Sequence, residues 1–155
     1  MSVSIIRTRD YPAIRELLID PEVYPYMTED LSPPAYEFKP PESEVIYYLA
    51  MRVAFRTGGL CMFLPINGVT LDVHIAVLPE YRGAPALEGV KKCFEWIWEN
   101  TPYARIEARV PDYNRAAIYL ANLAGMKRFG VSEKSFLRGG LLHDQVLLGI
   151  SKGES

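Results

Sequence analysis

Cysteine and histidine are scarce in this chain, which limits the metal and disulfide chemistry open to it. Its 155 residues include only two cysteines, Cys61 and Cys93, and two histidines. Two thiols this far apart form neither a disulfide framework nor a zinc site. We therefore expect both cysteines to be small buried hydrophobes, with no metal site and a reducing compartment.

The chain also lacks long hydrophobic runs and an excess of one charge. No apolar stretch approaches the ~20 residues that a membrane helix needs, and the first residues lack the apolar core of a signal peptide. The formal net charge is −2, with lysine and arginine spread along the chain. A nucleic-acid surface would need a concentrated basic patch. We expect a cytoplasmic protein with no membrane and no nucleic-acid partner.

The amino-acid composition is that of an ordinary globular protein. Apolar residues make up 49% and charged residues 23% of the sequence. A chain of this length fits one domain, here residues 1–155, and buries roughly 68–70% of its unfolded surface.

The order of predicted elements indicates an α/β (α+β) fold with a mixed sheet. Asp10 is expected to cap the first helix, a turn is expected at residues 56–59, and Asn67-Gly68 predicts a two-residue hairpin. We expect strands over residues 2–8, 45–55, 60–66, 70–78 and 105–110, helices over 10–20, 85–99 and from 111 to Gly125, and a closing hairpin within 136–150.

The segment from Glu22 to Glu44 combines five prolines with aromatic and acidic residues. A loop of this length in a compact domain is usually functional or disordered. The aromatics favour an ordered lid that lines an acceptor pocket, where its charge would favour a cationic amine. A solvated acidic loop is the alternative.

The run from His74 to Gly83 ends a strand in V-x-P-E-Y-R-G and leads into a helix. It resembles the acetyl-CoA signature of the GNAT (GCN5-related N-acetyltransferase) family, and with the next motif the resemblance covers about residues 45–152. It implies a single-domain GNAT fold, with a splayed strand pair holding acetyl-CoA. The cofactor-binding residues it implies are Ala76, Val77, Leu78, Arg82, Gly83, Ala84 and Ala86.

This loop departs from the family pattern, because Pro85 and Leu87 stand where glycines are usual. Proline removes one N–H donor but is tolerated in the first helical turn. The alternative interpretation is a plain strand-to-helix turn with a surface arginine.

A second motif, from Asn114 to Met126, resembles the family's N-x-x-A-x(7)-G-F helix. The resemblance implies that Asn114 meets the pantetheine arm, whereas its alternative role is at the start of the helix. The family often has a tyrosine acid seven residues after the asparagine, and Ala121 stands there. Tyr119 is kept as a candidate acid, although two positions on a helix diverge by roughly 200°.

Direct acetyl transfer to an amine needs a base beside the thioester. Asp72 and His74 are two residues apart on a predicted strand and so share one face with Ala76, while Ile75 and Val77 face the core. Either could act directly or through water. A structural histidine is the alternative.

These observations lead to an acyl-CoA-dependent N-acyltransferase that transfers acetyl to a small-molecule or peptide amine. The chain also resembles GNAT-like proteins of phages and prophages, which raises a rival: a non-catalytic GNAT-fold protein for binding or assembly. The altered loop and the missing tyrosine favour this rival. An acyl-CoA sensor lies between these two. A homodimer and an interface role for Trp96 are further expectations.

Overall fold

A computed structural model describes residues 2–154 and contains a seven-stranded sheet with the order β1-β2-β3-β4-β5-β7-β6. All neighbouring strands are antiparallel except β4 and β5, which are parallel. The elements are β1 (Val3–Arg7), α1 (Tyr11–Leu18), α2 (Tyr24–Met27), the 3₁₀ helix η1 (Ala35–Glu37), β2 (Tyr47–Val53), β3 (Arg56–Pro65), β4 (Thr70–Val77), the 3₁₀ helix η2 (Pro79–Tyr81), α3 (Ala84–Asn100), β5 (Arg105–Pro111), α4 (Arg115–Leu123), β6 (Lys127–Arg138) and β7 (Leu141–Ser151).

Local sequence explains where the helices begin and end. The Asp10 side chain accepts a hydrogen bond from the Ala13 N–H and caps α1, as expected. Gly125 has a φ of 102°, which is the left-handed conformation that glycine tolerates best. The Met126 N–H bonds the Ala121 carbonyl across this glycine, so α4 ends in a Schellman motif.

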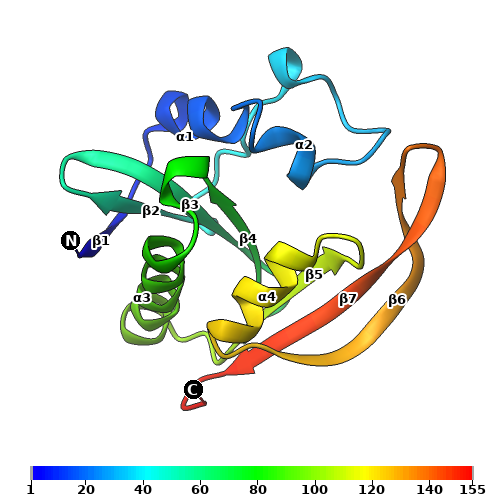
Figure 1. Ribbon diagram of the computed structural model, residues 1–155. Coiled ribbons are helices and arrows are strands. Elements are labelled where there is room, and N and C mark those ends of the chain that lie inside the picture. The colour runs from blue at the N-terminus through cyan, green and yellow to red at the C-terminus, as the bar shows by residue number, and fades with distance from the viewer. Residues whose placement is uncertain (1, 155) are drawn as a thin grey trace.

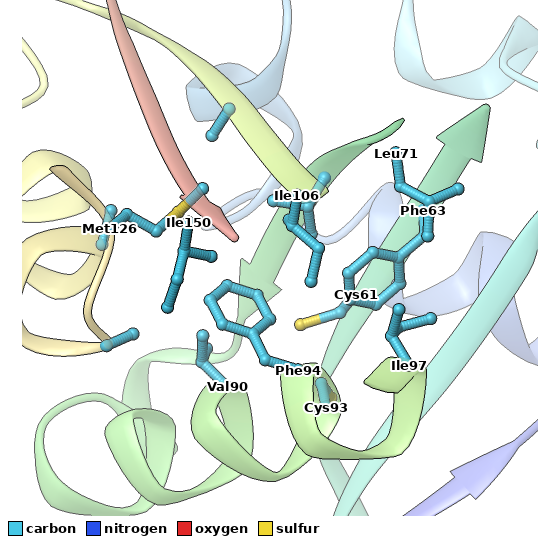
Figure 2. Packing of buried hydrophobic residues seen from close by; sticks show 14 of the residues in the cluster. Cys61, Phe63, Leu71, Val90, Cys93, Phe94, Ile97, Ile106, Met126 and Ile150 are labelled. Carbon is cyan, nitrogen blue, oxygen red and sulfur yellow. The ribbon is translucent and has the colours of Figure 1, made fainter. Parts of the chain in front are cut away.

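Two apolar clusters fill the two faces of the sheet. The larger joins α3 and α4 to the sheet, and Figure 2 shows Val90, Phe94 and Ile97 of α3 facing Ile106 of β5 and Phe63 of β3. The smaller cluster packs Ile14, Leu17 and Leu18 of α1 against the other face. In Figure 1, α1 and α2 lie to one side of the sheet, and α3 and α4 lie to the other.

Cys61 and Cys93 are both free and fully buried, as predicted. Burial raises the pKa of the Cys93 thiol, first by desolvation and then through its neighbour Cys61. Trp96 is half-buried, and its ring lies 5.9 Å from that of Tyr47. Within residues 2–154, no helix is long and apolar enough to cross a bilayer, and no cluster of three or more candidate ligand residues could hold a metal ion.

Several predicted boundaries were wrong. The β2–β3 turn lies at residues 54–55, with Ala54 at a φ of 56°, and not at residues 56–59, which already belong to β3. The hairpin at Asn67 spans residues 66–69, because the Asn67 side chain accepts bonds from the N–H groups of Val69 and Thr70 and widens the turn.

The start of α4 and the length of β6 were also mispredicted. Asn114, and not Pro111-Asp112, begins α4. Strand β6 begins at Lys127, well before the predicted Phe136. Two register shifts, at Arg128/Gly130 and Ser132/Phe136, break its alternation and hide it from pattern analysis.

Candidate active site

Strand β4 presents two polar side chains on the face opposite α3. Its neighbours Leu71 and Val73 are buried in the α3 cluster, and Ala76 is buried beneath α1. Asp72 and His74 therefore point away from α3, as the alternation predicts. The His74 Nε2 lies 3.0 Å from the Asp72 Oδ2, with the side chains 44% and 23% exposed. The pair is thus reachable from solvent.

Strands β4 and β5 pair only at their beginnings. The parallel register joins Thr70 to Arg105, Leu71 to Ile106 and Asp72 to Glu107, and then stops. Yet β4 runs on to Val77 and β5 to Pro111. Past Asp72, therefore, β4 and β5 no longer pair with each other. The backbone edges that they present to each other form no β-ladder among residues 2–154. Such edges are templates for an extended ligand with amide groups.

Strand β5 adds three charged residues to the face of Asp72 and His74. Ile106 and Ala108 are buried under the helices, so Arg105, Glu107 and Arg109 lie on the opposite face. The Arg105 Nε donates to the Glu107 Oε2 at 2.7 Å. The sequence analysis missed these residues, although charges at every second position of a predicted strand were a visible signal.

Arg105 is held from several sides. Its guanidinium donates to the Ser151 hydroxyl at 3.2 Å and lies 5.1 Å from the Phe129 ring centre. It also lies over Gly149, where a Cβ atom would collide with it. Arg109 is exposed, and no ion pair or hydrogen bond of its side chain is recorded with any residue from 2 to 154.

The start of α3 offers backbone donors at the far end of β4. Gly83 is the N-cap, with a φ of 89° and no side chain to cap the helix. Among the described residues, the N–H groups of Gly83, Ala84 and Ala86 have no recorded acceptor, and Pro85 has no N–H. Free N–H groups and the helix dipole together attract anions. The Arg82 Nη2 donates to the Glu22 carbonyl at 2.8 Å.

Helix α4 holds the other two predicted site residues. The Asn114 Oδ1 accepts a hydrogen bond from the Ala117 N–H at 3.3 Å, so this residue is the N-cap of α4. Its amide NH₂ is not used in that bond. Tyr119 is 65% exposed, whereas Ala121 is buried. Tyr119 thus lies on the solvent face of α4, as the angular separation from Ala121 predicts.

Residues 28–31, which we call the strap, are tied to the tip of the β6–β7 hairpin. The Asp30 carboxylate accepts hydrogen bonds from the N–H groups of Gly139 and Gly140, at 3.0 and 2.8 Å. These bonds, first that of Gly140, hold the pKa of Asp30 below its ordinary value. The Asp30 N–H donates to the Leu137 carbonyl, and the Glu29 carboxylate accepts from the Leu137 N–H.

One cavity of about 350 Å³ is bordered by α4, β6 and β7, and one of about 500 Å³ lies between α1 and strands β1–β3 and reaches Leu78. Neither contains Asp72 or His74 in its lining. The polar pair therefore lies outside both cavities, at the point where β4 and β5 stop pairing.

This arrangement of a seven-stranded mixed sheet with diverging β4 and β5 defines the GNAT acetyltransferase fold. A chimera of the Vibrio cholerae spermidine N-acetyltransferase SpeG superimposes with a TM-score of 0.80 at 17% identity, covering 97% of this chain and 96% of that one. SpeG from the same organism in complex with CoA and spermine gives a TM-score of 0.78 at 16% identity, over 99% and 97%. The ribosomal-protein-S5-alanine acetyltransferase from Vibrio fischeri gives 0.75 at 14%, over 97% and 92%.

Within this fold, the chain belongs to the family described as "Protein of unknown function (DUF2824)", which matches residues 29–152. Comparison with curated proteins finds no match. At these identities the solved structures establish the fold alone.

Proposed function

We propose that this protein is an acetyl-CoA-dependent N-acetyltransferase that acts on an amine. The observation that carries the proposal is the Asp72–His74 pair, 3.0 Å apart, at the point where β4 and β5 separate. A base on this strand can reach an amine that meets a thioester held in the opening.

The chain's own groups fit the parts of CoA. The edge of β4 that faces the opening at Ala76 and Val77 suits the amides of the pantetheine arm, whereas the Leu78 N–H already donates to the Gly58 carbonyl. The free N–H groups of Gly83, Ala84 and Ala86 suit the pyrophosphate, although Pro85 leaves them one donor fewer. In this proposal the Asn114 amide NH₂ donates to the arm, while its Oδ1 caps α4.

The proposed reaction balances without a covalent enzyme intermediate. The amine nitrogen forms a bond to the acetyl carbon and the carbon–sulfur bond breaks. His74 takes the proton from the amine, and Asp72 holds the imidazole ring in place. The CoA thiolate must gain a proton. Since Tyr119 is 65% exposed on the outer side of α4, we assign this step to solvent in preference to Tyr119.

Calorimetry with acetyl-CoA and with CoA tests the proposal first, and a thiol-release screen over amines follows. Arg82→Ala should weaken CoA binding by about 1–3 kcal/mol, since a charge-assisted contact is lost. Arg56→Ala is the matched control, because Arg56 is exposed on the β2–β3 hairpin. No CoA binding at millimolar ligand would overturn the proposal.

The altered phosphate loop supports a second candidate, a non-catalytic GNAT-fold protein used in binding or assembly. Pro85 removes a donor, and Ala121 stands where the family has its tyrosine. Tight CoA binding with no thiol release from any acceptor would favour a sensor of acyl-CoA. Failure of both assays would favour the assembly role.

A further inference from the structure

The acceptor has to approach the β4–β5 opening from the face that carries Asp72 and His74. We call this the acceptor face and define it by Asp72, His74, Arg105, Glu107 and Arg109. The register pairs Asp72 with Glu107, so both side chains lie on the same side of the sheet. His74 and Arg109 each lie two residues further along, on the two strands that border the opening.

Four of these five side chains already have partners. Asp72 contacts His74 at 3.0 Å, and Glu107 accepts from Arg105 at 2.7 Å. Arg109 is exposed and has no recorded polar side-chain partner among the residues described, 2–154. Among residues 2–154, Arg109 is therefore the charged group of the acceptor face that has no side-chain partner, and it lies on the strand opposite His74.

The acidic segment before β2 does not neutralise this cation. Its carboxylates at Glu29 and Asp30 accept bonds from the hairpin backbone. Glu44 pairs with Arg9 at 3.0 Å. The others, Glu22, Glu37 and Glu42, are exposed to solvent. Three of the six acidic side chains of this segment are therefore engaged elsewhere, and its preference for a cationic amine stays a prediction.

We propose that the acceptor carries an anionic group beside its amine, and that Arg109 binds this group while the amine faces His74. The proposal rests on the proposed acetyltransferase function and names its substrate class. Guanidinium binds carboxylate through two parallel hydrogen bonds, which fixes position as well as charge. An amino acid meets both requirements.

The two groups of the acceptor would contact different strands. The pairing of β4 and β5 ends at Asp72 and Glu107, so an acceptor that reaches from His74 to Arg109 spans the opening between the strands. A long polyamine would bring further positive charge next to Arg109, which like-charge repulsion disfavours.

The test is a thiol-release screen with acetyl-CoA over matched pairs of acceptors. The panel contains the amino acids, the same compounds as primary amides, and spermidine as a cationic polyamine. We expect each reactive amino acid to exceed its amide in kcat/KM. Equal or faster reaction of the amides or of spermidine would overturn the inference and leave the acetyltransferase proposal intact.

Arg109→Ala supplies the second arm. It should lower kcat/KM for amino acids by about 10- to 100-fold, the usual effect of losing a hydrogen bond to a charged group. It should leave the amides and the CoA affinity unchanged. Arg109→Lys should recover only part of the loss, and Arg56→Ala is the control for removing an exposed arginine.

Each outcome points to one conclusion. An Arg109→Ala protein that keeps its preference for amino acids overturns the role of Arg109. A wild-type protein that binds CoA but reacts with no amino acid overturns the substrate class. A protein that binds no CoA removes the proposed function, and this inference with it.

Discussion

The His74 side chain is exposed to solvent and is also held by a neighbouring carboxylate. Its ring is 44% exposed, so solvent reaches it, while Asp72 at 3.0 Å restricts its orientation. This exposure excludes a fully buried core histidine, and the role of His74 as a base stays a prediction.

We predict that His74→Ala lowers kcat by roughly 10²–10⁴-fold, the usual share of a general base, and leaves CoA affinity nearly unchanged. Steady-state kinetics and calorimetry measure the two effects. His143→Ala is the matched control, because the His143 Nε2 lies 3.1 Å from the Arg138 carbonyl at the hairpin. Full turnover by His74→Ala across pH 6–9 would remove His74 from the mechanism.

Among the elements, the strap is joined to the β6–β7 hairpin by several hydrogen bonds. Residues 28–31 contact Leu137, Gly139 and Gly140 through backbone and carboxylate groups. The Arg138 Nη1 also donates to the Thr28 carbonyl at 3.0 Å. The segment expected to be a lid is therefore anchored at the hairpin, and its ordered short helices α2 and η1 lie on either side of the anchor.

We predict that the Asp30 contacts fail in acid. The pKa of Asp30 is lowered in the folded protein, so the contacts are fully present above the ordinary value of about 3.9 and are lost as pH falls through the lower folded value. Amide NMR shifts of Gly139 and Gly140, followed from neutral pH to pH 2, measure this loss.

The matching variants separate this contact from general acid unfolding. Asp30→Ala should change the same two amide shifts at neutral pH. Glu37→Ala, an exposed acid in the same segment, should leave them alone. If the amide shifts of Gly139 and Gly140 change neither with pH nor in Asp30→Ala, these hydrogen bonds do not form in solution.

For the whole molecule, the narrow junction between β4 and β5 joins the two halves of the sheet. The register across it holds three residue pairs. Its middle pair, Leu71 and Ile106, is 0% exposed in both members. The opening beyond the junction can exist because α3 and this apolar pair hold the halves together.

We predict that Leu71→Ala lowers the free energy of unfolding by about 2–5 kcal/mol, because it leaves a cavity at the junction. Urea denaturation measures the change. Ile66→Ala is the control, since Ile66 is 53% exposed in the neighbouring turn and should change stability by less than about 0.5 kcal/mol. A loss below about 1 kcal/mol for Leu71→Ala would contradict the junction's role.

The sequence by itself determined those structural features that depend on residues close together in the chain. Asp10 capped its helix as expected, Gly125 ended α4, and alternation placed Asp72 and His74 on one face of β4. Capping, turn chemistry and strand alternation act within a few residues, so they can be read along the chain. The order of these local elements indicated an α/β fold with a mixed sheet, and the resemblance of two motifs to the GNAT family implied the GNAT fold.

Tertiary structure decided which side chains remain free. The charges at Arg105, Glu107 and Arg109 are equally visible in the sequence, but the register with β7 brings Ser151 opposite Arg105 and leaves Arg109 without a polar side-chain partner among residues 2–154. The anchoring of Asp30 likewise depends on a residue 109 positions away, Gly139. Such contacts form only when distant segments are brought together, because loop closure and packing of the whole chain decide them.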